Sequence, residues 1–174
     1  MILETSRLRL RPLAETDLDA LGAIAADPQV MAHVGDGVPL SRAATALWIT
    51  NAAASLRMSE VGSRGVVLRE SNVLIGWIGL IPTPHRNRLE LIYGFARAYW
   101  GRGYATEAAQ ALLANCSPDT VDATIAPENR ASWRILEKLG FSPVGEELDE
   151  DGLPTLRLRL DLRAEVNGPW SGRL

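Results

Sequence analysis

Alternating apolar and polar positions predict that the chain begins with a strand and continues into a sheet. Near the start, arginine alternates with Leu8, Leu10 and Pro12, which is the two-residue period of a strand with one buried face. Apolar runs predict further strands near residues 65–69, 73–81, 89–95 and 121–125, and another from Phe141 onward. The last strand is predicted over residues 156–162, where leucine alternates with arginine and aspartate.

Four helices are predicted between these strands. Thr16 or Asp17 can cap a helix that ends near residue 25, and Ser41 can start a second that reaches about residue 56. The third helix has the clearest pattern, one apolar face made of Ala105, Ala108, Ala109, Leu112 and Leu113. The fourth begins after Asn129, a good N-cap, and ends at Gly140, which suits the left-handed position beyond a helix.

The segment Trp-Gly-Arg-Gly-Tyr-Ala-Thr-Glu-Ala, residues 100–108, lies between an apolar strand and the third helix. Gly101 and Gly103 let the backbone turn tightly, so that successive N–H groups and the helix N-terminus point into one concavity. The segment therefore predicts a pyrophosphate cradle. A simple strand-to-helix turn is the alternative, and it accounts for one glycine more easily than for two.

Two other nucleotide-binding turns fit this segment less well. A dinucleotide-binding turn needs glycine or alanine where this chain has Thr106, and its acidic ribose contact would be Asp122, which lies inside an apolar run. A P-loop needs Gly-Lys-Ser or Gly-Lys-Thr, which the chain lacks. Neither class is favoured.

The glycine segment and the helix at 129–141, about 30 residues later, together resemble the GNAT superfamily of N-acetyltransferases, and within it the RimJ/RimL branch. The resemblance covers nearly the whole chain and includes residues 4–12, 75–79 and 89–93. It implies an α/β (α+β) fold with a mixed, mostly antiparallel twisted sheet of about six or seven strands and about four flanking helices. The two central parallel strands are expected to splay apart in a V.

The same resemblance implies acetyl-CoA as cosubstrate. In the family the glycine loop binds the pyrophosphate, the preceding strand pairs with the pantetheine arm, and an asparagine matching Asn129 contacts that arm. The family loop commonly begins with glutamine or arginine, where this chain has Ala98, but the backbone cradle is unaffected. The expected cofactor-binding residues are Ile92, Tyr93, Gly94, Phe95, Gly101, Arg102, Gly103, Tyr104, Ala105, Thr106, Asn129 and Ser132.

Glu90 and Ser132 are the candidate catalytic residues. Glu90 matches an acidic residue of the family's strand and could act as general base through one water, although an ordinary glutamate at a strand edge is an equal alternative. Many relatives carry a proton-donating tyrosine seven residues after the asparagine, where this chain has Leu136. Ser132 matches the serine of the RimJ/RimL pattern and could hydrogen-bond the leaving thiolate or cap the helix.

An amine is the expected acceptor. An α-amine with a pKa near ~8 is partly neutral at neutral pH, whereas a lysine side chain near ~10.4 is almost fully charged, so an N-terminal substrate demands less of a base. A small amine such as a polyamine or an antibiotic is the alternative, and acidic loop residues could receive it: Asp27, Asp36 and Glu60. A further alternative is a catalytically inactive acyl-CoA sensor or interaction module.

Composition limits the remaining possibilities. The chain has 174 residues, 47% of them hydrophobic, and a net charge of −3, which favours one domain over residues 1–163 with a tail at 164–174 and disfavours nucleic acid as main ligand. The sequence shows no signal segment and no apolar run long enough to span a membrane, and Cys116 is its single cysteine. We therefore expect a cytoplasmic protein that does not associate with membranes. His33 and His85 lack zinc-ligand spacing, so no metal is expected. A homodimer is possible.

Overall fold

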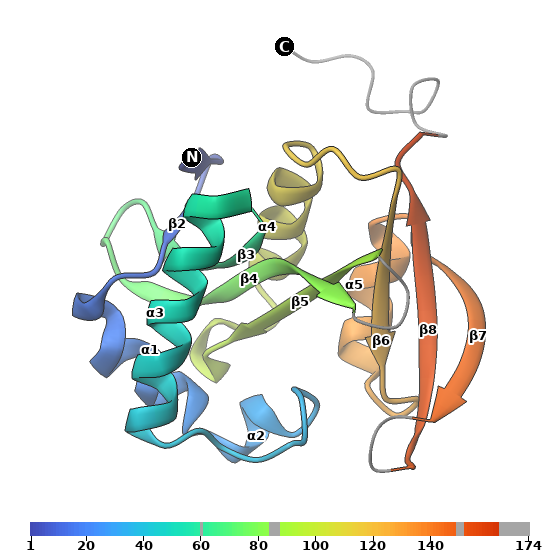
Figure 1. Ribbon diagram of the computed structural model, residues 1–174, viewed down its shortest axis with the longest axis horizontal. Helices are drawn as coiled ribbons and strands as arrows, with labels where there is room; N and C mark the ends of the chain where they lie inside the picture. Colours follow the sequence, from blue (N-terminus) through green and yellow to red (C-terminus); the bar gives the residue numbers. More distant parts are fainter. Residues whose placement is uncertain (60, 84–87, 149–151, 164–174) are drawn as a thin grey trace. The chain divides into compact units, whose positions relative to one another are not determined.

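The computed structural model describes residues 1–59, 61–83, 88–148 and 152–163 (Figure 1). Two compact units divide the chain: the first is Met1–Ile81 with Ile92–Asn115, and the second is Pro82–Leu91 with the described residues from Cys116 onward. The expected tail at 164–174, His85 and Glu60 lie outside the described residues. The single domain over residues 1–163 stays a prediction.

The sheet of the first unit is built from antiparallel neighbours. In hydrogen-bonding order these are β1 (Leu3–Glu4), β2 (Leu8–Pro12), β3 (Gly62–Leu68) and β4 (Leu74–Thr83). Most positions of β3 and β4 are buried regardless of which way they point. A strand is buried in this way when both faces of its sheet are covered.

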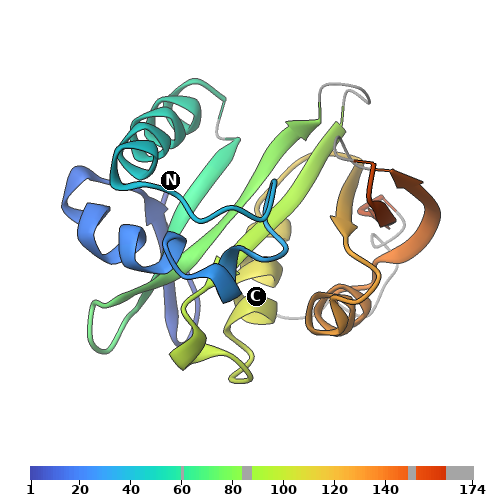
Figure 2. The ribbon, with the colours of Figure 1, turned by 90° about the horizontal axis from the view of Figure 1, so that it is seen from below.

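Helices supply the two covering layers of the first unit. One face of its strands carries α1 (Leu18–Ala25), α2 (Pro28–Met31) and α3 (Arg42–Ser59), and the other carries α4 (Tyr104–Leu113) (Figure 2). Two short 3-10 turns, Glu15–Asp17 and Arg97–Tyr99, complete the unit. At the centre, Trp77 is 1% exposed and meets Trp48 edge to face, with ring centres 5.0 Å apart.

The arginines of β2 are ion-paired. Arg9 Nε lies 2.8 Å from Glu4 Oε1, and Arg11 Nη1 lies 2.6 Å from Asp17 Oδ2. Asp17 occupies the predicted N-cap position of α1, but its carboxylate accepts from the N–H of Ala14 and from Arg11 and not from the helix. Burial acts to raise the pKa of Asp17, but these hydrogen bonds outweigh it and hold the pKa below its ordinary value.

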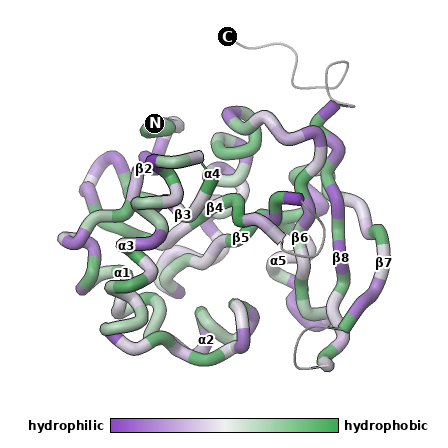
Figure 3. The backbone as a smooth tube through the Cα atoms, in the orientation of Figure 1, coloured by the Kyte–Doolittle hydropathy of each residue, from purple (hydrophilic) through white to green (hydrophobic). Residues whose placement is uncertain are grey.

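The second unit contains the parallel pair. The first half of β5 (Arg88–Phe95) runs parallel to β6 (Thr120–Ile125), with Leu89 opposite Val121 and Glu90 opposite Asp122. Next to β6 lies β8 (Pro154–Asp161), antiparallel, and hydropathy alternates along it as the sequence predicts (Figure 3). Helix α5 (Arg130–Lys138) packs on β6.

The outer strand of the second unit is β7 (Ser142–Leu148), which among the described residues pairs with β8 alone and is largely exposed. Its register with β8 shifts between Pro143 and Gly145, which marks a bulge.

The expected fold is confirmed in its class: among the described residues, eight strands form a mixed and mostly antiparallel order β1-β2-β3-β4-β5-β6-β8-β7, with β5 and β6 parallel. One strand, β1, and one α-helix, α2, were not predicted, nor were the two 3-10 turns. A two-residue strand is too short to show a period, whereas Asp27 followed by Pro28 is an N-cap and first-turn signal that could have revealed α2. The V-shaped splay stays a prediction.

Candidate active site

The glycine segment adopts the conformation that the sequence predicts. Gly101 and Gly103 have φ of 72° and 78°, and Gly103 is the N-cap of α4 in the left-handed region. A Cβ at Gly101 would meet no heavy atom within 4 Å, so its backbone conformation and not crowding requires glycine there. The third position, Thr106, lies in the first turn of the helix.

The N-terminus of α4 leaves donors unused within the helix. The N–H of Glu107 donates to Gly103 O at 3.0 Å, and the N–H groups of Tyr104, Ala105 and Thr106 come before this first N–H that donates within the helix. No side chain caps this end, because the N-cap is a glycine. These N–H groups and the positive end of the helix dipole form an arrangement suited to a phosphate.

Close packing fixes the strand that leads to this loop. A Cβ at Gly94 would lie 2.3 Å from the ring of Trp77, so glycine is needed for the approach of β5 to the core. The indole N–H of Trp100 donates to Phe95 O at 2.6 Å and ties the loop to the end of the strand. Phe95 is buried, while Ile92 and Tyr93 are half-buried.

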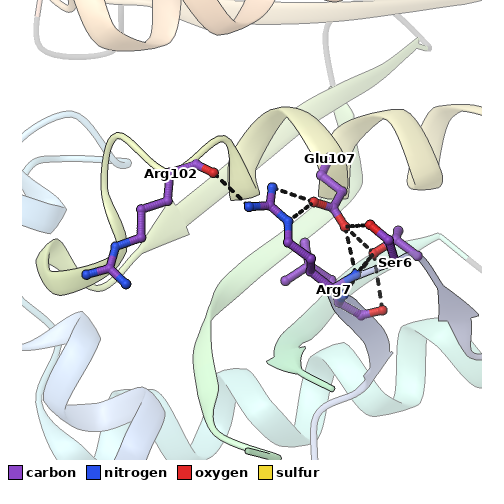
Figure 4. A network of polar contacts seen from close by, with 6 residues as sticks. Ser6, Arg7, Arg102 and Glu107 are labelled. Carbon is purple, nitrogen blue, oxygen red and sulfur yellow. Dashed lines mark hydrogen bonds and ion pairs between the residues drawn. The ribbon is translucent and has the colours of Figure 1, made fainter. Parts of the chain in front are cut away.

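Arg102, between the two glycines, is exposed, and its guanidinium lies 5.7 Å from the centre of the Tyr99 ring. On the other side of the loop, Arg102 O accepts a hydrogen bond from Arg7 (Figure 4). The loop is therefore held through its backbone while the Arg102 side chain stays accessible.

In the second unit, Asn129 caps α5 as predicted. Its Oδ1 accepts from the N–H of Ser132 at 3.1 Å. The other end of α5 also follows the prediction: Gly140 has φ of 89°, its N–H donates to Glu137 O, and the N–H of Phe141 donates to Leu136 O. This pair of bonds is a Schellman motif at the C-terminal end, so that with the Asn129 cap both ends of α5 are fixed.

The capping role of Asn129 Oδ1 can be tested with two variants. Because Oδ1 is the cap, Asn129→Ala is expected to lower the free energy of unfolding by about 1 kcal/mol, whereas Asn129→Asp keeps a capping oxygen and is expected to cost only a few tenths. Urea unfolding measures both. Equal losses in the two variants would contradict the cap as the structural role of Asn129.

Ser132 and Leu136 are four residues apart on α5 and differ in burial. Leu136 is fully buried, so the position of the tyrosine found in many relatives is a core position here. Ser132 is half-buried, and its Oγ makes no hydrogen bond in the described part of the chain. The serine hydroxyl does not cap the helix, since the side chain of Asn129 does, and it is available as a donor.

Glu90 is held by β6. It is half-buried, and its Oε1 accepts from the backbone N–H of Thr124 at 3.1 Å. The carboxylate is thereby given a fixed position beside the parallel strand, which an unrestrained glutamate at a strand edge would lack. Its role as a base stays a prediction.

Sequence reasoning missed the pairing of Asp122, which is fully buried. Arg159 donates to both of its carboxylate oxygens, at 2.7 and 3.1 Å, and Arg157 Nη1 lies 4.0 Å away. The hydrogen bond to Asp122 raises the pKa of Arg159 above its ordinary value. The ion pair with Arg159 therefore accounts for an aspartate inside an apolar strand, and a ribose contact at Asp122 is not needed to explain it.

The acidic loop residues are engaged in local structure. Asp27 caps α2 through the N–H of Gln29 and lies 2.6 Å from Arg97 Nε, and the hydrogen bond from Arg97 holds the pKa of Asp27 below its ordinary value. Asp36 accepts from the N–H of Val38. Neither carboxylate is therefore an unrestrained site for a cationic acceptor.

The remaining candidates have structural explanations. Cys116 is half-buried, and burial raises the pKa of its thiol, which disfavours the nucleophilic thiolate. His33 is exposed. No set of three or more histidine, cysteine, aspartate or glutamate side chains that could hold a metal occurs among the residues described. In that same part of the chain, every helix is too short or too polar to cross a bilayer.

Comparison with known proteins agrees with this geometry. The family model of the acetyltransferase (GNAT) domain matches residues 7–142. The uncharacterized N-acetyltransferase p20 of Bacillus licheniformis is 28% identical over 149 residues, which cover 82% of this chain and 83% of p20. An acetyltransferase structure from Agrobacterium tumefaciens is 29% identical, with a TM-score of 0.78 over 92% of this chain and 94% of that one.

A second solved structure contains coenzyme A. RimL, a ribosomal L7/L12 α-N-protein acetyltransferase in complex with coenzyme A, has a TM-score of 0.77 over 94% of this chain and 99% of its own. At 15% identity this likeness concerns the fold alone.

In the described residues, β5 and β6 form a parallel pair in a mixed sheet, and β5 leads to the glycine loop and to a helix without a side-chain cap. Together with the family match, these features place the chain in the class of acetyl-CoA-dependent acetyltransferases. The chain belongs to the GNAT family of acetyltransferases, of the RimJ/RimL type, as the sequence analysis expected. The family uses acetyl-CoA. The match therefore favours the enzyme over an inactive acyl-CoA-binding module.

Proposed function

We propose that this chain transfers the acetyl group of acetyl-CoA to a primary amine, either a protein N-terminal α-amine or the amine of a small molecule. The observation that carries the proposal is the glycine loop: two left-handed glycines lead into a helix whose N-cap is a glycine, so that its first N–H groups come before any intrahelical hydrogen bond. In this proposal the loop holds the pyrophosphate of acetyl-CoA through backbone N–H groups and the helix dipole.

The proposed cofactor contacts extend beyond the loop. Asn129 uses Oδ1 to cap α5, so its amide NH2 group is the part that would bind the pantetheine arm. The edge of β5 at Ile92–Phe95 would pair with the same arm through its backbone. Arg102, exposed between the two glycines, would contribute positive charge near the phosphates.

The proposed reaction is direct attack in a ternary complex. The amine nitrogen forms a bond to the thioester carbonyl carbon, the carbon–sulfur bond then breaks, and the amine proton passes to Glu90 directly or through one water. The hydroxyl of Ser132 donates a hydrogen bond to the departing thiolate, which takes its proton from solvent. Backbone N–H groups near the end of β5 would stabilise the carbonyl oxygen.

Glu90→Gln tests this assignment with little structural cost, because an amide oxygen can still accept from the N–H of Thr124. We expect about a 10²-fold fall in kcat, the size of a lost general base. Glu137→Gln, at an exposed position of α5, is the matched control and should retain wild-type rates.

The measurement is thiol release from acetyl-CoA with peptides that have free N-termini, with polyamines and with aminoglycosides. Turnover of one acceptor class identifies the substrate. Turnover that survives in Glu90→Gln would remove Glu90 from the mechanism. An inactive wild-type protein that still binds acetyl-CoA would argue against all the tested acceptors.

A further inference from the structure

Arg7, directly before β2, contacts the glycine loop, although about 100 residues separate them in the sequence. Arg7 Nη1 donates to Arg102 O at 3.1 Å, while Arg7 Nε donates to Glu107 Oε2 at 2.7 Å (Figure 4). The guanidinium also lies 4.5 Å from the centre of the Tyr104 ring. One arginine thus contacts the loop and the first turn of α4 together.

Glu107 is the fixed point of this cluster. Besides Arg7, its Oε1 accepts from Thr5 Oγ1 at 2.5 Å, from Ser6 Oγ at 3.3 Å and from the backbone N–H of Arg7 at 3.1 Å. The side chain of Glu107 is only 16% exposed. Burial acts to raise its pKa, but the hydrogen bonds from Thr5 and Arg7 outweigh it, so the pKa stays below its ordinary value and Glu107 is ionised at neutral pH.

The bond to Arg102 O determines where a neighbouring N–H points. In a planar trans peptide the carbonyl and the N–H that follows it point in opposite directions. Because Arg102 O is turned toward Arg7, the N–H of Gly103 is turned away from Arg7. Gly103 has no Cβ and lies in the left-handed region, so this peptide would otherwise rotate readily.

Arg7 is not arranged as a phosphate ligand. Each of its guanidinium nitrogens already has a partner: Nε and Nη2 contact Glu107, and Nη1 contacts Arg102 O. Its charge is balanced by the Glu107 carboxylate 2.6 Å away. The contacts hold backbone in place and offer little net charge to an anion.

We propose that Arg7, anchored by Glu107 and Thr5, is a positioning residue that pre-organises the glycine loop for the pyrophosphate of acetyl-CoA. The inference rests on the proposed function, because it assumes that this loop is the cofactor cradle. Its energetic basis is pre-organisation: a loop already in its bound conformation loses less entropy when the ligand arrives. Positioning should therefore change cofactor affinity and leave the chemical step unchanged.

Arg7→Met removes the guanidinium contacts with Glu107 and Arg102 O, which together are called the anchor, and keeps an unbranched side chain of similar length. Calorimetry with coenzyme A should give a Kd about tenfold higher than wild type, as expected for the loss of one pre-organising contact. With an amine acceptor, KM for acetyl-CoA should rise while kcat at saturating acetyl-CoA stays within about twofold. Arg9→Met is the matched control, because Arg9 is also ion-paired but touches Glu4 and not the loop.

Two further variants separate positioning from direct phosphate contact. Arg7→Lys keeps the charge but cannot reach the carboxylate and the carbonyl together, so positioning predicts weaker binding and direct contact predicts retained binding. Glu107→Gln weakens the anchor, so positioning predicts a higher Kd, whereas a direct ligand freed from its carboxylate would bind equally well or better. Retained affinity in either variant would overturn the proposal.

A readout without cofactor separates this inference from the proposed function. In the amide NMR spectrum of the free protein, Arg7→Met should shift the Gly103 resonance and speed its hydrogen exchange, and Arg9→Met should not. An unchanged Gly103 amide would contradict the anchor itself. If the Gly103 amide responds but the wild-type protein does not bind coenzyme A, the anchor is supported and the proposed cofactor role of the loop is contradicted. The positioning proposal is then contradicted as well, because it depends on that role.

Discussion

Asp122→Ala is expected to lower the free energy of unfolding by about 3 kcal/mol, because it leaves Arg159 without its counter-charge next to a fully buried position. The estimate is at the lower end for a broken buried pair, since the Arg159 side chain is 25% exposed and water can solvate part of the released charge. Urea unfolding of the ligand-free protein measures the loss.

Asp119→Ala is the matched control for this effect. Asp119 also pairs with an arginine, Arg163, but both side chains are largely exposed, so the loss should be at most about 0.5 kcal/mol. A second variant tests the cause: Asp122→Leu combined with Arg159→Met should recover much of the stability, because no buried charge is left uncompensated. Equal stability of Asp122→Ala and Asp119→Ala would refute the buried-charge explanation.

Gly94→Ala is expected to cost about 3 kcal/mol of stability, at the upper end for an overpacked core. The added Cβ would lie 2.3 Å from two ring atoms of Trp77, which is 1% exposed and has little room to move. Trp77 is also packed against Trp48, so a shift of its ring would disturb a second contact. Thermal or urea unfolding detects the change.

Gly22→Ala provides the opposite control. Gly22 lies inside α1, and a Cβ there would meet nothing within 4 Å, so alanine should stabilise the protein by about 0.5–1 kcal/mol through helix propensity. In Gly94→Ala, the additional change Trp77→Phe removes ring volume from the clash and should recover part of the loss. A Gly94→Ala variant as stable as wild type would contradict the crowding at this position.

Local signals in the sequence were sufficient for much of the fold. The strands around residues 65–95, the caps at Asn129 and Gly140 and the left-handed glycines all depend on patterns a few residues long. Such patterns fix secondary structure because period, capping and positive φ are properties of neighbouring residues. The family resemblance added what local patterns cannot supply, namely a mixed, mostly antiparallel sheet with two parallel strands at its centre.

Contacts between distant residues were not predictable in this way. Arg7 pairs with Glu107, Asp122 with Arg159, and Asp27 with Arg97, and nothing in the spacing of these charges identifies the partner. The roles of Glu90 and Ser132 stay predictions for a different reason. They depend on where a substrate atom lies, which neither hydrophobic periodicity nor a hydrogen-bond pattern determines.

The outer strand β7 bears on how this protein avoids aggregation. An open sheet edge can recruit a strand from another chain, and natural proteins block such edges with proline, bulges and charge. On β7, Pro143 lacks an N–H, the register shift follows it directly, and Glu146 adds charge. If two copies of this chain associate, we therefore expect a surface other than the free edge of β7 to join them.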